Sequence, residues 1–381
     1  MSLENLRNEI DQIDDKILEL FFQRMEKAEK VVDYKQNNSL PILNAARERD
    51  ILHRVCSACD NTTYQGYTKM LFSTLMNISR THQTGLLNPN SETVVKIRSA
   101  IGNVKSEFPC NPIVACQGVE GAYSQLATTK LFDAPKIMYM RTFDGVFSAV
   151  EQGLCTYGVL PIENTMSGSV TDVYELMKKY KFHIVRSVKH RINHVLLTKN
   201  NADIKNIKEI FSHEHAINQC SEFLKSNPQI KVTVCENTAI AAEMTASSDR
   251  DDVAAISSKN CAELYGLNIA AQNIQNKDHN YTRFICISKN LEIYDGANKI
   301  SLMMSSDNKP GALYSILTKF SVLNLNLTKL ESRPIAGTDF EFMFYFDMDG
   351  NVKDETVLNL IGQLDSGSDN FTFLGNYSEL Y

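Results

Sequence analysis

The first 35 residues carry an apolar stripe with helical spacing. Leucine and isoleucine recur at intervals of three and four, at Leu3, Leu6, Ile10, Ile13, Ile17 and Leu20. The stripe continues through Arg24, Ala28, Val31 and Lys35, so two cations occupy positions that an amphipathic helix normally gives to apolar side chains. Burying a charge is costly unless a partner compensates it. The pattern therefore predicts one long helix that holds an anion along its second half.

Two further helical stripes also end in polar side chains. The second predicted helix presents Arg47, Ile51, Val55 and Ala58 on one face, with Glu48 beside Arg47, and the third presents Phe72, Met76, Ser79 and Gln83. One helix with cations beyond Leu20 would simply emerge into water, but three such helices favour a buried polar pocket between them. A first helix of about 35 residues would be ~50 Å long, which is too long for a monomeric domain of this size. An interlocked dimer is the expected solution.

The pattern changes from Pro112 onward to short apolar runs separated by helical segments. We expect buried strands over 113–116, 137–140, 158–162, 184–188, 194–198, 232–234, 254–256 and 284–287. Helices such as 122–131 and 170–179 lie between them, which indicates a two-lobed α/β unit. The last segment predicts strand 300–305, helix 312–320, strands 327–331 and 340–346, helix 355–363 and strand 371–374, the βαββαβ order of a ferredoxin-like domain.

These patterns give three domains. We expect a helical domain over 1–88, a linker over 89–110 that includes a polar helix at 91–106, an α/β domain over 111–288 and an α+β domain over 299–381, with a second linker at 288–298.

Composition narrows the class of protein. The 381 residues have a net charge of −6, so no general basic surface attracts nucleic acid or an anionic membrane. No apolar run is long enough to span a membrane, and the charged N-terminal helix does not resemble a signal peptide. Nine scattered cysteines, an odd number, favour reduced thiols and a cytoplasmic protein over a disulfide framework. Cys56 and Cys59 form a C-x-x-C, but it lies in a predicted helix with no second pair, so we expect no metal site.

Four stretches of the α/β domain carry chemistry-bearing residues, although each has a structural explanation of its own. The loop Gly118–Ser124 follows a strand and opens a helix, so its amides could bind a carboxylate or merely form a tight turn. Ser167-Gly-Ser within Pro161–Val170 could be a helix cap. The other two stretches are Ser212–Cys220, with His213 and His215, and Asn280-Tyr-Thr-Arg-Phe284.

Taken together and in order, these motifs resemble the bifunctional chorismate mutase–prephenate dehydratases of phenylalanine biosynthesis, which end in an ACT regulatory domain. The resemblance covers the whole chain. It implies an all-helical mutase domain, a dehydratase domain similar to two-lobed periplasmic binding proteins, and a ferredoxin-like ACT domain. It implies chorismate, prephenate and L-phenylalanine as ligands, no cofactor, and a homodimer or homotetramer.

The family's mutase pattern falls on Arg7, Arg24, Lys35, Asn44, Arg47, Glu48, Ser79 and Gln83. Rearrangement of chorismate to prephenate is pericyclic, so the enzyme has to hold the compact conformer and stabilise charge on the breaking ether oxygen. The resemblance implies that the arginines clamp carboxylates, Lys35 and Gln83 donate to the ether oxygen and Glu48 accepts from the ring hydroxyl. Arg7 lies on another face of the helix and is expected in the partner's pocket. The family often has an acidic residue where Asn44 stands, so we expect altered affinity.

For the dehydratase, the resemblance implies a central role for Thr282 in the loss of CO₂ and the ring hydroxyl from prephenate. Proton donation to the departing hydroxyl triggers this step, and a threonine would act as a hydrogen-bond donor or proton relay. Asn164, Ser167, Gln219 and Arg283 are expected to place the carboxylates and the leaving group, and Glu163 to hold the proton.

In the last domain, two motifs resemble the phenylalanine-binding motifs of this family. The first consists of Gly311, Ala312, Leu313 and Tyr314, and the second of Glu331, Ser332, Arg333 and Pro334. The first opens a helix after Pro310, where free amides suit an amino-acid carboxylate, and Glu331 could face the ammonium group. Two alternatives stay open: a dehydratase that prefers arogenate, and a non-enzymatic amino-acid sensor. The inward cations of residues 1–84 argue against the sensor.

Overall fold

The computed structural model describes residues 2–38, 40–87, 91–200, 202–306, 308–335, 341–368 and 370–381. They form two compact units. The first comprises Met1–Arg98, Met303–Phe346 and Val352–Thr372, and the second comprises Ser99–Leu302, Asp347–Asn351 and Phe373–Tyr381. In the part of the chain that the structure describes, no helix combines the length and apolarity needed to cross a membrane.

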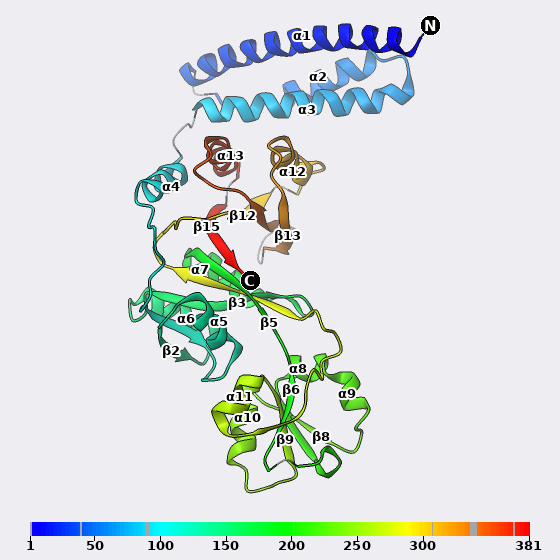
Figure 1. Ribbon diagram of the computed structural model, residues 1–381. Helices are drawn as coiled ribbons and strands as arrows, with labels where there is room; N and C mark the ends of the chain where they lie inside the picture. Colours follow the sequence, from blue (N-terminus) through cyan, green and yellow to red (C-terminus); the bar gives the residue numbers. More distant parts are fainter. Residues whose placement is uncertain are drawn as a thin grey trace. The chain divides into compact units, whose positions relative to one another are not determined.

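Three helices begin the first unit, as the apolar stripes predict (Figure 1). They are α1 (Leu3–Asn37), α2 (Ala45–Ser57) and α3 (Thr62–Leu87). Ser2 caps α1 by accepting a hydrogen bond from the amide of Asn5 at 3.2 Å. The apolar stripe of α1 is exposed in the single chain, from Leu3 at 65% to Leu20 at 62%. Farther along, Ala28 is buried as expected, but Val32 is buried in place of Val31, so the buried face of α1 shifts by one residue.

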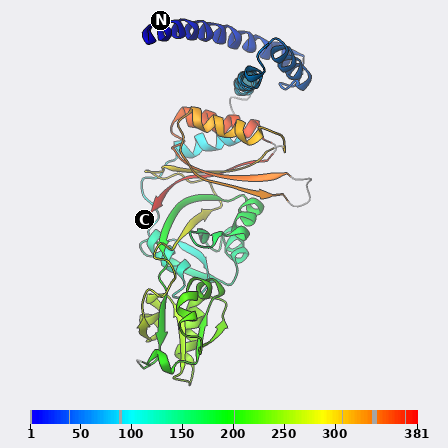
Figure 2. The same ribbon diagram turned by 90° about the vertical axis from the view of Figure 1, so that its right-hand side faces the viewer.

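The C-terminal segment has the predicted βαββαβ order. Its elements are β12 (Lys299–Ser306), α12 (Ala312–Val322), β13 (Leu327–Pro334), β14 (Phe342–Asp349), α13 (Glu355–Ser366) and β15 (Phe371–Leu380). The strands lie in the order β13-β14-β12-β15, and α12 and α13 lie side by side over one face of them (Figure 2). The predicted start of the third strand, Phe340, falls outside the described residues. The first unit ends within helix α4 (Glu92–Gly102), after Arg98. Arg98 forms a bidentate pair with Glu355 at 2.7 and 2.8 Å.

A mixed sheet forms the larger lobe of the second unit, with strand order β15-β5-β11-β3-β1-β2. Its elements are β1 (Ile113–Gln117), α5 (Tyr123–Leu131), β2 (Lys136–Met140), α6 (Phe143–Glu151), β3 (Tyr157–Asn164), β4 (Gly168–Ser169), α7 (Thr171–Tyr180), β5 (His183–Arg191) and β11 (Tyr281–Ser288). Strand β1 is parallel to β2 and β3, whereas β11 is antiparallel to both β3 and β5.

The smaller lobe has its own sheet, with strand order β10-β6-β9-β7-β8. Its elements are β6 (Val195–Thr198), the 3₁₀ turn η1 (Ile204–Asn206), β7 (Glu209–Ser212), α8 (Glu214–Gln219), α9 (Ser221–Lys225), β8 (Lys231–Val234), α10 (Thr238–Ser247), β9 (Val253–Ser257), α11 (Lys259–Tyr265) and β10 (Asn268–Ala271). The chain passes between the lobes twice, after β5 and before β11. The two-lobed α/β prediction is confirmed.

The glycine loop before α5 joins the two lobes. Gly121 has φ +86°, and a Cβ there would come within 2.9 Å of the Cys261 sulfur on α11. Tyr123 then donates to the carbonyl of Asn193 at 2.7 Å. These contacts support the tight-turn interpretation of this loop, because only glycine accepts both the close approach and the backbone conformation.

Parts of both predicted linkers are packed rather than exposed. Phe108 stacks on Phe132 with ring centroids 4.8 Å apart, and Tyr294 is buried in the same cluster. Glu292 accepts hydrogen bonds from Lys105 at 2.7 Å and Tyr157 at 3.0 Å. Phe108, Ile293 and Tyr294 therefore pack on the α/β core, and exposed Lys105 is tied to it through Glu292. The polar composition around these residues concealed this.

Candidate active sites

Arg24 and Ser79 meet between α1 and α3 in the helical segment. The Arg24 guanidinium donates to the Ser79 hydroxyl and, at 3.1 Å, to the carbonyl of Leu75. Burial lowers the pKa of Arg24. The structure thus brings together two of the residues that the sequence predicts around an anion.

Lys35 and Gln83 are held by different neighbours. Lys35 donates to the carbonyl of Ile42, in the connection between α1 and α2. Gln83 is 8% exposed, and among the described residues no hydrogen-bond partner is found for its Oε1 atom. Since buried polar atoms are normally satisfied, this amide is a candidate for ligand binding.

Of the other residues in the predicted mutase pattern, one caps a helix, one forms an ion pair and two are exposed. The Asn44 side chain caps α2 by accepting from the amide of Arg47 at 3.0 Å. Glu48 pairs with Arg80 at 3.4 Å, a neighbour that the sequence analysis missed. The side chains of Arg7 and Arg47 are exposed, so the single chain does not bring them to Arg24.

In the dehydratase segment, Asn164 at the end of β3 lies opposite Thr282 near the start of β11. The Asn164 Nδ2 atom donates to Thr282 Oγ1 at 2.9 Å and to Asn280 Oδ1 at 2.8 Å. Its Oδ1 atom accepts from the amides of Met166 and Ser167, both at 2.9 Å. This turn fixes the orientation of the Asn164 amide, and with it the hydrogen bond to Thr282.

Gln219 extends the network to a buried histidine. Its Oε1 atom accepts from Asn280 Nδ2 at 2.8 Å and is 2.9 Å from His194 Nε2, and its Nε2 atom donates to Ser167 Oγ at 3.4 Å. The structure therefore joins Asn164, Ser167, Gln219 and Thr282 into one group. Asn280 and His194 complete it, and sequence reasoning gave neither a role, although Asn280 opens the motif that contains Thr282.

The chemistry of amides sets the direction of these hydrogen bonds. A carbonyl oxygen only accepts, so His194 carries its proton on Nε2. Burial lowers the pKa of His194, which favours the neutral ring. At the other end, Thr282 Oγ1 accepts from Asn164, so its own hydroxyl proton is available to donate. Thr282 is 9% exposed.

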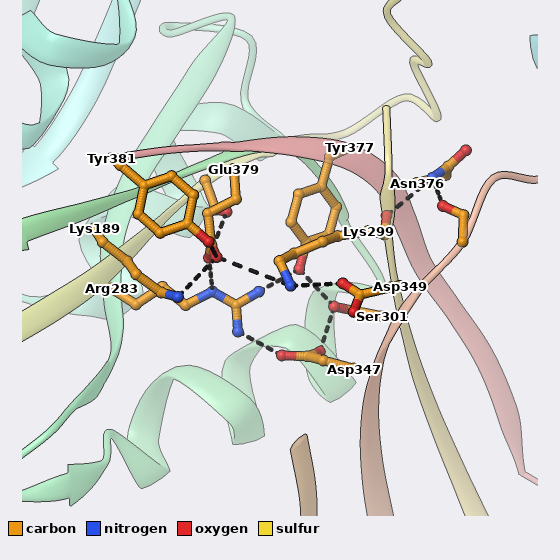
Figure 3. Close-up of polar contacts among 12 residues, drawn as sticks. Lys189, Arg283, Lys299, Ser301, Asp347, Asp349, Asn376, Tyr377, Glu379 and Tyr381 are labelled. Atoms are coloured by element: carbon orange, nitrogen blue, oxygen red, sulfur yellow. Dashed lines mark hydrogen bonds and ion pairs between the residues drawn. The ribbon is translucent and has the colours of Figure 1, made fainter. Parts of the chain in front are cut away.

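Arg283 and Glu163 lie on the opposite face of the sheet from Thr282. They face each other in the next register position, and successive residues of a strand alternate between faces. The Arg283 guanidinium donates to Asp347 and, at 2.6 Å, to the Tyr377 hydroxyl, and its Nε atom forms an ion pair with Glu379 at 2.8 Å (Figure 3). The structure therefore does not bring Arg283 into the group around Thr282.

Two further motifs have local structural roles. His213 accepts from the amide of His215 at 3.3 Å and caps α8. In the C-terminal segment, Gly311 begins α12 in the left-handed region with φ +84° and supplies no side-chain cap. Tyr314 is exposed, and Glu331 on β13 pairs with Arg333 at 2.6 Å.

Comparisons with known proteins match the helical segment and the α/β segment separately. A family model described as chorismate mutase type II matches residues 6–84, and one described as prephenate dehydratase matches residues 114–292. The bifunctional chorismate mutase/prephenate dehydratase of Enterobacter agglomerans is 32% identical over 380 residues, which cover 98% of this chain and 95% of that protein. An arogenate dehydratase/prephenate dehydratase of Arabidopsis thaliana is 34% identical over 276 residues, or 69% of this chain and 72% of that one.

Among solved structures, the prephenate dehydratase of Arthrobacter aurescens in complex with L-Phe matches with a TM-score of 0.63 and 28% identity. The match covers 70% of this chain and 89% of that one. Fold and site thus define a two-lobed dehydratase joined to a helical mutase domain. The chain belongs to the family of bifunctional chorismate mutase/prephenate dehydratases, and this disfavours the non-enzymatic sensor.

Proposed function

We propose that this protein rearranges chorismate to prephenate in its helical domain and converts prephenate to phenylpyruvate between the lobes of its α/β domain. The observation that carries the proposal is the hydrogen-bond network that runs from His194 through Gln219, Asn280 and Asn164 to Thr282. The test supplies chorismate as the sole substrate. Phenylpyruvate formed by the purified protein alone supports both activities, prephenate accumulation contradicts the dehydratase, and untouched chorismate contradicts the mutase.

In the mutase reaction the protein acts by position and charge. Arg24 beside Ser79 is suited to one carboxylate of chorismate, because a guanidinium offers paired donors. Lys35 and Gln83 donate to the ether oxygen as its bond breaks, and Glu48 accepts from the ring hydroxyl. Arg47, and Arg7 from a second copy, complete the carboxylate contacts, and Asn44 holds the helix start that carries Arg47 and Glu48.

In the dehydratase reaction Thr282 donates its proton to the hydroxyl that leaves the ring. The bond to the ring carboxylate breaks, its electron pair enters the ring, and the C–O bond breaks as water forms, giving CO₂ and an aromatic ring. The proton balance requires one proton from solvent, which Thr282 relays. Asn164 orients the Thr282 hydroxyl by donating to its oxygen. Ser167 and Gln219 bind the substrate's polar groups. Glu163 and Arg283 do not contact the substrate in this proposal, because they lie on the face of the sheet opposite Thr282.

Feedback by phenylalanine is proposed to act through the C-terminal domain. The Arthrobacter relative is described in complex with L-Phe, and Gly311, Ala312, Leu313 and Tyr314 open α12 with no side-chain cap on its amides. Glu331, Ser332, Arg333 and Pro334 provide the second motif on β13. Adding L-phenylalanine should lower the dehydratase velocity with a saturable midpoint, and a constant velocity would contradict this part of the proposal.

The assembly is proposed to be a homodimer or homotetramer in the cytoplasm. The exposed apolar stripe of α1 supports pairing of the helical domain, and all nine cysteines are free thiols, as expected of a reducing compartment. Preference for arogenate is the alternative, because the name of the Arabidopsis relative includes both arogenate dehydratase and prephenate dehydratase. Comparing kcat/KM for the two substrates decides between them.

A further inference from the structure

Arg283 lies at the centre of a buried ionic cluster on the face of β11 away from Thr282. Its Nη1 atom donates to Asp347, its Nη2 atom to the Tyr377 hydroxyl at 2.6 Å, and its Nε atom lies 2.8 Å from a Glu379 oxygen (Figure 3). Ser301 donates to Asp347 and is 2.7 Å from the Tyr377 hydroxyl. Each of the three guanidinium nitrogens therefore faces a polar group of the protein itself.

The charges of this cluster balance. Lys189, Arg283 and Lys299 face Asp347, Asp349 and Glu379, with Lys189 3.0 Å from Glu379 and Lys299 3.1 Å from Asp349. The centre is buried: the Arg283 side chain is 8% exposed and the Glu379 side chain 2%. Burial lowers the pKa of Arg283, but the acidic neighbours outweigh it and the pKa is raised, so the cation is permanent. Such a cluster contributes little net stability, but removing one of its buried members, Arg283, Asp347 or Glu379, leaves an unbalanced charge among the others. Asp349 is 50% exposed and pairs with Lys299 instead of Arg283.

The backbone at Arg283 connects this cluster to the active site. Thr282 and Arg283 are neighbours on β11, so a fixed guanidinium restrains the strand that carries the Thr282 hydroxyl. The pairing of β11 with β3 is also irregular between Arg283 and Phe284. Such irregularities weaken the ladder and re-aim side chains near active sites. On its other side β11 pairs with β5 in regular register from Tyr281 to Cys286. The side-chain anchor at Arg283 therefore adds to the β5 ladder where the pairing with β3 is irregular.

We propose that Arg283 is a positioning residue of the dehydratase site: its ion pairs with Asp347 and Glu379 set where β11 holds the Thr282 hydroxyl, and prephenate does not touch it. The inference rests on the proposed dehydratase function. It also ties dehydration to β14 and β15, strands that contain residues of the C-terminal domain, because Asp347 and Glu379 belong to them.

The key variant is Asp347→Asn, which removes a charge without changing shape. The Ser301 hydroxyl can then accept instead of donate, so the variant keeps its hydrogen-bonding capacity. We expect kcat for prephenate to fall about 10- to 100-fold with KM within about twofold, since a misplacement near 1 Å has effects of this size. Glu379→Gln should behave likewise, and Arg283→Lys should retain more activity than Arg283→Gln.

Asp349→Asn is the matched control, because it removes the same charge two residues along β14, where Asp349 pairs with Lys299. It should stay within about twofold of wild type in kcat, which is the scatter expected of a surface change. Mutase velocity of each sample reports the amount of protein, and near-UV circular dichroism reports whether the second unit, which contains Arg283 and Asp347, is folded. A kcat for Asp347→Asn within twofold of wild type would overturn the inference, as would a tenfold rise in KM confined to the Arg283 variants.

A structure of the wild-type protein with a prephenate analogue is a second test, and misfolding of a variant cannot affect it. We expect Arg283 to keep its partners, and an analogue carboxylate within ~3 Å of its guanidinium would overturn the inference. Wild-type protein without dehydratase activity would instead contradict the proposed function. The two failures are therefore distinguishable.

Discussion

The Thr282 hydroxyl accepts one hydrogen bond and keeps one proton to give. Asn164 donates to it at 2.9 Å, and the Asn164 amide is itself oriented by the turn at Met166 and Ser167. This arrangement converts a weakly acidic side chain into a directed donor. It also explains why Asn164, Gln219 and Asn280 accompany Thr282, since each fixes the next amide.

Replacing Thr282 by valine should therefore abolish most dehydration while preserving the shape of the site. We expect kcat to fall about 10²- to 10⁴-fold, the usual contribution of a proton-transfer group, while Thr282→Ser stays within about tenfold of wild type. Phenylpyruvate release from prephenate measures both variants, and mutase velocity reports folded protein. Full activity in Thr282→Val would remove this hydroxyl from the mechanism.

In the helical domain, Lys35 and Gln83 are the residues whose replacement should slow the mutase reaction. Lys35→Ala and Gln83→Ala should each lower mutase kcat about 10²-fold or more, because each removes a donor to the charge that develops on the ether oxygen. Lys30→Ala is the matched control, an exposed lysine on the same helix. Chorismate consumption is the measurement, and near-normal rates in the first two variants would contradict their assignment.

Among the secondary-structure elements, apolar patterns located the strands that are rich in branched residues but missed three others. Strand β7 carries the acidic residue Glu209, β10 reads Asn-Ile-Ala-Ala with weak strand propensity, and β4 has only two residues. Contacts with distant residues stabilise these strands despite their weak local propensity, as the hydrogen bonds of Glu209 with Lys231, Thr233 and Arg250 show. The apolar pattern of the strand itself does not reveal such contacts.

The motif around Thr282 shows a second limit of sequence reasoning. The family resemblance implied one site for Thr282 and Arg283, whereas strand alternation places their side chains on opposite faces. Three other residues that the resemblance grouped with Thr282, namely Asn164, Ser167 and Gln219, lie in one hydrogen-bond network with it. The partners of Arg283 come from residues about 60 and 100 positions away along the chain, and the sequence gives no sign of them.

Strand β7 also yields a pH prediction for the smaller lobe. Glu209 accepts from Thr233 at 2.7 Å, Lys231 at 2.9 Å and Arg250 at 2.6 Å, and these hydrogen bonds lower its pKa to about 2. A carboxyl whose pKa is lower in the folded protein stabilises the fold above its unfolded pKa of about 4.3 and loses that contribution as the pH falls toward the folded value. Solvent screening reduces the size of the effect, because Arg250 and Lys231 are exposed.

Glu209→Gln should accordingly be less stable than wild type at pH 7, and the difference should shrink between pH ~4.3 and about 2. Urea unfolding of both proteins at pH 7, 5 and ~3.5 measures it. Glu214→Gln supplies a control on the neighbouring helix α8. A difference that does not change with pH would contradict the assigned pKa.

At the scale of the whole molecule, the proposed dimer accounts for two features of the helical domain. The apolar stripe of α1 is exposed from Leu3 to Leu20, and the side chains of Arg7 and Arg47 are exposed rather than beside Arg24. A second copy of α1 would cover the stripe, and its Arg7 would enter the first copy's pocket. One assembly step then explains both the exposed apolar residues and the missing carboxylate contacts.

Ile17→Glu tests this arrangement, because it places a charge in the middle of the stripe, where Ile17 is 58% exposed in the single chain. A buried, unpaired carboxylate at such an interface is strongly unfavourable, so the helical domains should separate and mutase activity should fall at least about tenfold. Dehydratase activity should fall less, because Thr282 and its network lie within one chain. Sedimentation velocity measures the assembly, and Gln12→Glu, which adds the same charge on another face of α1, is the control. Wild-type mutase activity in a monomer of either protein would show that the pocket is complete without a partner, and Arg7 would lose its proposed role.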